Sequence, residues 1–411
     1  MNSKRKFRVM IVSTPSSPLG TIPQKNGYDV RCSQVFLALA LSDSVEKIFT
    51  LEFVSNLDIS DFSYSSDKYV PCLFQFPNIA LRYNSRILIY SSFVIKTLEV
   101  ITSKKFWSYF KASDLLFIEC IYSLFPLYFL LGIFSRMLNK IYVLEMHDVF
   151  SFGKKINLLL RGISLLIEKI LAPLSSWIVC FTYEEGKYLK NKNISVIPTS
   201  TLLYNLNQNV FGVRSTKTKL QLLLHDYSHY KLVTFIGDLR TPVNRPAVDY
   251  IVKTLAPNFL DSRKDIVFVI AGDGYELWKK VNIPKNVLFT GHLDKDELHC
   301  LLTRSAVCIA PLTYNTGFKS KIVSYITAKK PVILTKEAAL SLPVQHLPSL
   351  IVVPLEDFAN KIIEVVDHEE IFSKKVEISY QYFETYFSFD KFKQSYNNLI
   401  SFLAAKYKYT K

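Results

Sequence analysis

The sequence predicts an α/β protein made of two doubly wound domains, each with a parallel sheet between layers of helices. Three observations lead to this prediction. The chain has 411 residues, more than one hydrophobic core usually spans. Short apolar runs rich in Val, Ile and Phe alternate with longer amphipathic stretches, which is typical of strands buried on both faces and of the helices that cover them. The alternation stops in a polar stretch at 200–230 and then restarts.

The first half of the chain contains six predicted strands. They cover 7–12, 47–53, 114–120, 141–145, 177–181 and 195–197. Helices are predicted at 30–41 and at 155–171, the second with Lys and Arg on one side. This alternation predicts one Rossmann-like domain over 1–205, followed by an interdomain connection over 206–230.

The second half repeats the alternation and predicts another Rossmann-like domain over 231–385. Its predicted strands are 232–236, 265–270, 287–290, 307–311, 331–334 and 351–353, and its predicted helices are 246–255, 296–303, 320–328 and 355–367. Glycine follows three of these strands within two residues, at Gly237, Gly272 and Gly291. The end of the chain, 386–411, contains one further amphipathic helix at 389–407.

One apolar stretch, at 115–134, has about the length that spans a bilayer. Glu119 lies within it, and Pro126 divides it. We interpret it as a buried strand ending at Cys120 and a buried helix from about Leu124 to Leu138. The basic start of the chain is followed by a short apolar run, which predicts a first strand and not a secretory signal. We therefore expect a cytoplasmic protein.

The formal net charge of +15 favours an anionic partner. The first 200 residues hold 23 Lys and Arg against 15 Asp and Glu, so +8 lies there and +7 in the rest. Because the charge is spread over both halves and not held in a basic tail, it favours a phosphate-binding site or a membrane-facing surface over nucleic-acid binding.

Several classes of site have no signature in the sequence. The six cysteines, at positions 32, 72, 120, 180, 300 and 308, show no CxxC spacing, and no His, Cys and Glu cluster has metal-ligand spacing. There is no Walker A motif, no GxGxxG after the first strand and no GxSxG elbow. This argues against a nucleoside triphosphatase, a dehydrogenase, a zinc hydrolase and a serine hydrolase.

In an open parallel sheet, ligands bind beyond the carboxyl ends of the strands, so the residues after each strand are candidates for function. Gly27 precedes a predicted helix whose free backbone N–H groups suit an anion or a hydroxyl. His147 follows the strand at 141–145, and Arg240 follows the strand at 232–236. An ordinary loop, a structural histidine and a solvated arginine remain the alternative interpretations of these three.

The stretch 311–332, PLTYNTGFKSKIVSYITAKKPV, has the richest pattern. Lys319, Ser320 and Lys321 gather at the start of a predicted helix, where cations oppose the helix dipole. An anion such as a diphosphate would remove that conflict, and local conflicts of this kind are typical of functional sites.

Residues 232–334 resemble the family 4 glycosyltransferases, which have a fold of two Rossmann-like domains facing a central cleft, called GT-B. The resemblance is carried by FIGDLRTPVNRPAVDYI, VFVIAGDGYELW, NVLFTGHLDKDELHCLL and AVCIAPLTYNTGFKSKIVSYITAKKPVILT, in that order. The first half matches less well, through VMIVSTPSSP, NGYDVR, LEMHD, SWIVCFTYEE and SVIPTS.

The resemblance implies transfer of a sugar from a nucleotide-diphosphate sugar to a glycan or lipid-linked acceptor, with retention of configuration. It implies no metal and no cofactor beyond the sugar donor, and no nucleic-acid partner. The implied catalytic residues are His147, Arg240, Lys319 and Lys321. The implied donor-binding residues are Gly27, Arg31, Gly237, Gly272, Gly291, His292, Thr316, Gly317, Phe318, Ser320 and Ser324. The implied role of the last helix is to cross back to the first domain.

One departure from the family pattern leaves alternatives open. Many members carry two glutamates that bracket a pattern like EGFGLPVLE, and Thr316 and Ser324 replace both here. A subset of the family has a Ser-Lys helix start that resembles SKIVSY. A catalytically inactive GT-B scaffold, or a partner subunit that binds nucleotide or glycan, is the alternative, and a nucleotide-sugar epimerase is a more distant one. Contact of the basic region 154–171 with the inner face of the membrane also stays open, against a helix that only packs on the core.

Overall fold

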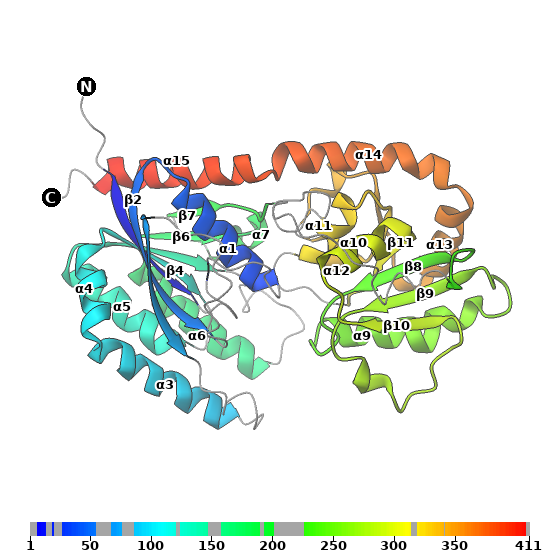
Figure 1. The fold of residues 1–411 in the computed structure, drawn as a ribbon, viewed down its shortest axis with the longest axis horizontal. Helices are drawn as coiled ribbons and strands as arrows, with labels where there is room; N and C mark the ends of the chain where they lie inside the picture. Colours follow the sequence, from blue (N-terminus) through cyan, green and yellow to red (C-terminus); the bar gives the residue numbers. More distant parts are fainter. Residues whose placement is uncertain are drawn as a thin grey trace. The chain divides into compact units, whose positions relative to one another are not determined.

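A computed structural model describes residues 6–13, 19, 27–54, 67–75, 86–120, 124–146, 158–189, 193–200, 226–313, 319–340 and 342–407 of the chain (Figure 1). The chain forms two compact units. Unit 1 comprises Met1–Ser200 with Phe389–Lys411, and unit 2 comprises Thr201–Ser388. Each unit has its own parallel sheet, so the predicted α/β class with two doubly wound domains is confirmed.

Unit 1 contains a seven-stranded parallel sheet in the order β3-β2-β1-β4-β5-β6-β7. The strands are β1 (Phe7–Ser13), β2 (Val45–Val54), β3 (Tyr69–Gln75), β4 (Leu115–Cys120), β5 (Ile141–Met146), β6 (Trp177–Cys180) and β7 (Ile194–Val196). Six of them lie where the apolar runs predict strands. The strand β3 was not predicted; it carries Pro71 and pairs with β2 at one side of the sheet.

Helices cover both faces of this sheet. They are α1 (Gly27–Ala40), α3 (Arg86–Thr102), α4 (Lys104–Ala112), α5 (Phe125–Met137), α6 (Leu158–Leu174), α7 (Tyr183–Leu189) and α15 (Phe389–Tyr407). Alternate residues of β1 enter different cores: Val9 and Ile11 pack with α1 and α15, whereas Met10 and Val12 pack with α4 and α5. Burial on both faces explains why the strands are apolar throughout.

The apolar stretch at 115–134 folds as predicted, into β4 and α5 with Pro126 in the first turn of the helix. Within the described residues, no helix combines the length and the apolar character that a membrane span requires.

Unit 2 contains a six-stranded parallel sheet in the order β10-β9-β8-β11-β12-β13. Its strands are β8 (Lys231–Ile236), β9 (Ile266–Ala271), β10 (Val287–Gly291), β11 (Ser305–Ala310), β12 (Val332–Leu334) and β13 (Leu350–Val352). Its α-helices are α9 (Asn244–Tyr250), α10 (Lys295–Arg304), α11 (Ser320–Thr327), α12 (Lys336–Ala339), α13 (Phe358–Asp367) and α14 (Glu369–Tyr386). The strand order runs outward in opposite directions from β8 and β11, so it reverses between these two central strands. Ligands bind at such a reversal in open parallel sheets.

Two helical segments of unit 2 differ from the prediction. The helix predicted at 246–255 begins at Asn244 and continues through a π turn, Ile251–Leu255, and a 3₁₀ turn, Ala256–Phe259. The long helix α14 was not predicted. By contrast, the start of α10 follows the sequence closely, because Asp294 and Glu297 form a reciprocal capping box there.

Candidate functional site

The carboxyl ends of β8, β9 and β10 meet at one edge of the unit 2 sheet and are joined through glycines. Gly237, Gly272 and Gly291 have φ values of 152°, 137° and 75°, which favour glycine. The N–H of Gly237 donates to the Ala271 carbonyl (3.0 Å), and the N–H of Gly272 donates to the Gly291 carbonyl (2.8 Å). A Cβ on Gly272 would lie 1.9 Å from the Gly237 oxygen, so only glycine permits this approach of the two loops.

Lys321, in the first turn of α11, brings a cation to this edge. Its amino group donates to Asn244 Oδ1 (2.6 Å) and lies 4.0 Å from the centre of the Phe235 ring. A Cβ on Gly237 would lie only 3.0 Å from Lys321 Nζ. Desolvation and the nearby Lys319 lower the pKa of Lys321 well below its ordinary value. Among the described residues, no carboxylate lies within ion-pair distance of this amino group.

The start of α11 is held against β8. The hydroxyl of Tyr325 accepts from the Ile236 N–H (2.9 Å), so the helix is anchored at the end of the strand that precedes Gly237. Lys319 occupies the N-cap position and is buried, with no side-chain cap on the helix. Ser320 begins the helix, and Ser324 is buried one turn later. Two lysines at a helix start without a side-chain cap make this a basic edge.

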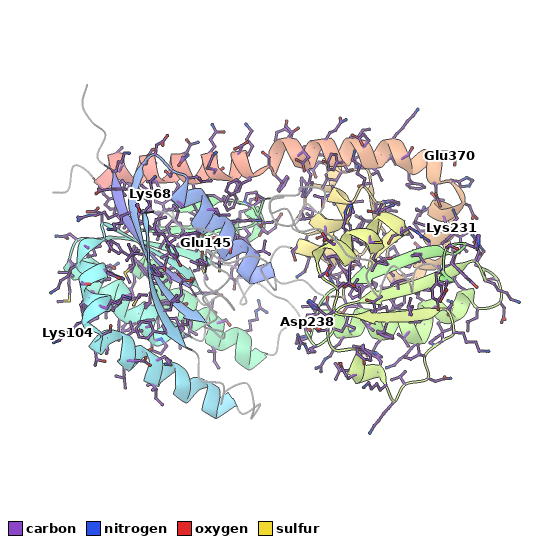
Figure 2. All side chains as sticks on the ribbon, viewed as in Figure 1. Lys68, Lys104, Glu145, Lys231, Asp238 and Glu370 are labelled. Carbon is purple, nitrogen blue, oxygen red and sulfur yellow. The ribbon has the colours of Figure 1, made fainter. Side chains whose placement is uncertain are left out.

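Arg240, by contrast, is already paired with carboxylates. Its guanidinium donates to both oxygens of Asp238, at 2.8 and 2.9 Å, and lies 3.5 Å from Asp273. Partial desolvation acts to raise the pKa of Asp238, but the hydrogen bonds from Arg240 outweigh it and lower that pKa below its ordinary value. His292 Nδ1 lies 3.4 Å from Asp273, and its side chain is largely exposed. Figure 2 shows Asp238 at the end of the unit 2 sheet that follows β8.

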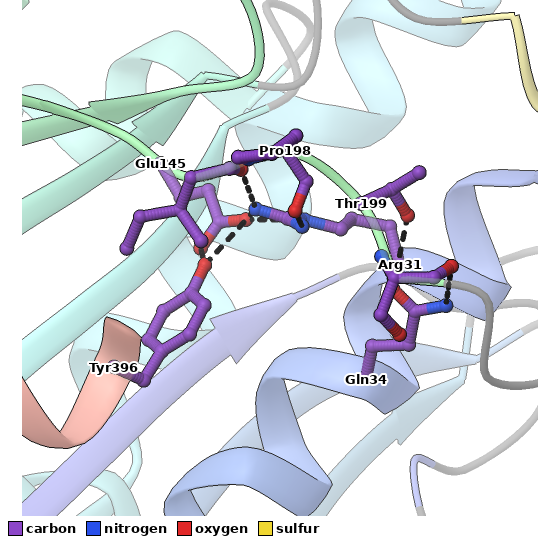
Figure 3. Close-up of polar contacts among 8 residues, drawn as sticks. Arg31, Gln34, Glu145, Pro198, Thr199 and Tyr396 are labelled. Atoms are coloured by element: carbon purple, nitrogen blue, oxygen red, sulfur yellow. Dashed lines mark hydrogen bonds and ion pairs between the residues drawn. The ribbon is translucent and has the colours of Figure 1, made fainter. Parts of the chain in front are cut away.

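Arg31, like Gly27, lies in unit 1 and not at the unit 2 edge. It is 1% exposed and donates to Glu145 Oε1 (2.8 Å), the carbonyls of Ile197 and Pro198, and the hydroxyl of Tyr396 (Figure 3). Tyr396 in turn donates to Glu145 Oε2 (2.8 Å). The guanidinium is thus occupied by protein groups, and its contact with a donor stays a prediction.

The network around Arg31 ties α1, β5 and α15 together. Burial raises the pKa of Glu145, and the charge of Arg31 opposes that rise. Next to it, Gln34 accepts from the hydroxyl of Thr199 (2.9 Å) and from the N–H of Ser200 (3.1 Å). These contacts explain the burial of strongly polar groups at the carboxyl end of the unit 1 sheet.

The structure therefore brings together, at one edge of unit 2, eight of the predicted residues: Gly237, Arg240, Gly272, Gly291, His292, Lys319, Ser320 and Lys321. His147, Thr316, Gly317 and Phe318 lie outside the described residues, and Gly27 begins α1. Asp238, Asn244 and Asp273 were missed; an asparagine or aspartate in a loop has no signal of its own in a single sequence. In the part of the chain that the structure describes, no three His, Cys, Asp or Glu side chains gather as metal ligands would.

The segment that contains this edge of unit 2 matches a known protein family. Residues 230–368 match the family model described as glycosyl transferases group 1. A search of curated proteins found no match.

Solved structures share the fold over the whole chain. A sucrose-phosphate synthase from Thermosynechococcus elongatus has 15% identity and a TM-score of 0.73, covering 98% of this chain and 100% of its own. HepE of Anabaena, in complex with UDP and glucose, has 12% identity and a TM-score of 0.66, covering 96% and 99%. The structure of trehalose-6-phosphate from E. coli bound with UDP-2-fluoro glucose has 11% identity and a TM-score of 0.69, covering 96% of this chain and 98% of its own. Residues 230–368 thus match the glycosyl transferases group 1, and the two doubly wound units have the GT-B fold of these solved structures.

Proposed function

We propose that this chain is a glycosyltransferase that moves a sugar, with retention of configuration, from a nucleoside-diphosphate sugar to a glycan or lipid-linked acceptor. One observation carries the proposal. Lys321 is a partly buried lysine at the carboxyl edge of the unit 2 sheet, beside the turn at Gly237, with no carboxylate partner among the described residues. Desolvation disfavours its charged form, and a bound diphosphate would supply the counter-charge that restores it.

The chemistry of transfer explains why cations are needed. When the bond between the sugar and the diphosphate breaks, negative charge grows on the leaving phosphate oxygen. Lys319 and Lys321 stabilise that charge from the start of α11, together with the positive end of the helix dipole. Arg240 joins them when its pairing with Asp238 loosens.

UDP is the first nucleotide to test, since the structures of HepE and of the E. coli protein hold UDP or a UDP sugar. The excess of +15 charges agrees with an anionic donor. We further propose a cytoplasmic location, with the acceptor reached in solution or at the inner face of the membrane.

Two steps test the proposal. Calorimetric titration with UDP, GDP, ADP and inorganic pyrophosphate identifies the donor class, and the matching nucleotide sugars are then assayed for transfer and for hydrolysis. Replacing both Lys319 and Lys321 by Ala should abolish turnover and leave the far-UV circular dichroism unchanged. Lys253→Ala, which removes an exposed lysine of unit 2, is the matched control and should retain activity. Full activity of the double variant would remove this site.

The scaffold alternative rests on Ser324, which stands where many relatives have the second glutamate and is buried in α11. Binding of a nucleotide sugar without transfer or hydrolysis, across a panel of acceptors, would favour that alternative.

A further inference from the structure

Asn244, the first residue of α9, connects the loop after β8 to Lys321. Its Nδ2 donates to the Asp238 carbonyl (2.8 Å), and its Oδ1 accepts from Lys321 Nζ (2.6 Å). The side chain is buried, and the Asp238 bond fixes which end of the amide faces the lysine. Asn244 therefore has one orientation, with its oxygen aimed at the amino group.

Space around this contact is tight. A Cβ on Gly237 would lie 2.7 Å from Asn244 Nδ2 and 3.0 Å from Lys321 Nζ. The Phe235 ring lies 4.0 Å from the same Nζ. Asn244, Phe235 and the bare Cα of Gly237 thus bound the position of the amino group, which a flexible lysine side chain would otherwise leave unspecified.

The neutrality of the partner distinguishes Lys321 from other lysines of unit 2. Lys231, Lys253 and Lys329 each pair with a carboxylate at 2.7–3.0 Å. Those carboxylates cancel the lysine charge, and at position 244 a carboxylate would also repel an incoming phosphate. An amide oxygen accepts the same hydrogen bond without cancelling the charge.

We infer that Asn244 is a positioning residue that holds the Lys321 amino group against the turn at Gly237 through a neutral acceptor, so that the lysine charge remains available to the donor diphosphate. The inference rests on the proposed function, since it assumes a diphosphate at this edge. It adds a requirement that the function alone does not make: the residue at 244 has to be a hydrogen-bond acceptor without charge.

The test compares Asn244→Asp and Asn244→Ala in the full chain. Both variants lose the donation to the Asp238 carbonyl, but the aspartate keeps the acceptor and pairs with Lys321, so its melting temperature should exceed that of the alanine variant while its Kd for UDP and for inorganic pyrophosphate rises about tenfold or more above the wild-type value. The alanine removes the acceptor without adding charge, so it should lower the melting temperature and weaken binding less than the aspartate does. Asn258→Asp, at an exposed position of unit 2, controls for the added negative charge and should bind like the wild type.

The melting temperatures and Kd values of the two variants, compared with each other, separate the two possible roles of Asn244. A purely structural role predicts that affinity follows stability, with the aspartate variant binding at least as tightly as the alanine variant; that result overturns the inference while the proposed function stands. If the wild-type protein binds neither UDP nor any other nucleoside diphosphate nor pyrophosphate, the proposed function falls and the inference falls with it.

Discussion

The two units place polar groups at the same edge of the same kind of sheet, but they use them in opposite ways. Both sheets follow the strand order 3-2-1-4-5-6 from one side, with a seventh strand in unit 1. At the carboxyl edge of unit 1, Arg31 and Glu145 are both buried and satisfy each other. At the carboxyl edge of unit 2, Lys321 has only a neutral partner and Arg240 remains largely exposed.

The difference shows that polar residues after parallel strands do not identify a ligand site by themselves. In unit 1 they replace ligand contacts by internal ones that reach from α1 to α15, 365 residues apart in the sequence between Arg31 and Tyr396. In unit 2, Arg240 pairs with exposed carboxylates, and Lys321 has an amide partner and no ion pair among the described residues. A cation with a buried counter-charge holds the fold together, whereas a cation without one is the better candidate for binding an anion.

The largest effect is expected from breaking the internal pair of unit 1. Arg31→Met leaves Glu145 buried without its cation, and the free energy of unfolding should fall by about 3–5 kcal/mol. Urea unfolding followed by fluorescence measures this. Arg8→Met, which breaks a longer and more exposed pair with Asp114, should cost less than about 1 kcal/mol. An Arg31→Met variant that keeps its stability but loses nucleotide affinity would contradict this structural role and indicate that Arg31 contacts the donor.

A large effect of a different kind is expected at Lys321. Lys321→Met should reduce the rate of sugar transfer about 10²–10³-fold, because the leaving diphosphate loses a pre-positioned cation. Stability should not fall, since the removed charge is desolvated and has no ion-pair partner among the described residues. Steady-state kinetics and thermal unfolding measured on the same samples check both statements. A variant that unfolds while its remaining folded fraction turns over normally would contradict the assignment.

Two glycines should respond with opposite signs. Gly272→Ala places a Cβ against the Gly237 carbonyl at a φ of 137°, and should cost about 2–3 kcal/mol of stability as well as donor affinity. Gly162→Ala, within α6 of unit 1, meets no atom within 4 Å and should stabilise that unit by about 0.5–1 kcal/mol. Thermal unfolding with and without UDP measures both. Equal effects at the two positions would mean that the loops of unit 2 do not approach as closely as described.

The smallest expected effect depends on pH and concerns Glu119 in β4. Desolvation and the nearby Glu145 raise the pKa of Glu119 well above its ordinary value, against smaller effects of Cys32 and Arg31. The folded state therefore holds this proton more tightly than the unfolded state, so stability is lost as pH rises from the ordinary pKa towards the raised one. Glu119→Gln should match the wild type at low pH and exceed it by about 1 kcal/mol at pH 8. Melting curves that stay parallel across this pH range would contradict the raised pKa.

Much of the fold could be predicted because buried parallel strands are apolar on both faces and therefore stand out as short runs. That pattern located six strands in each half, and amphipathic spacing located the helix α15. The strand β3 escaped because it contains Pro71 and lies at one side of its sheet, where alternation is weaker. The continuation of α9 through a π turn escaped because a sequence pattern does not report hydrogen-bond register.

The candidate site was predictable only in part. Glycines directly after strands and the lysines before α11 are local signals, and both lie at the edge of unit 2. The partners of those residues are not local: Asn244 and Lys321 are 77 residues apart, and Arg31 and Glu145 are 114 apart. A single sequence does not show that one cation meets an amide and the other a carboxylate, and this contrast separates the two units.

A crystal structure of the protein with the tightest-binding nucleoside diphosphate tests the central claim most directly. The account predicts the diphosphate at the carboxyl edge of the unit 2 sheet, within hydrogen-bonding distance of Lys321 Nζ and beside Gly237, with Asn244 Oδ1 still accepting from the lysine. A diphosphate bound elsewhere, with Lys321 contacting only protein atoms, would contradict it.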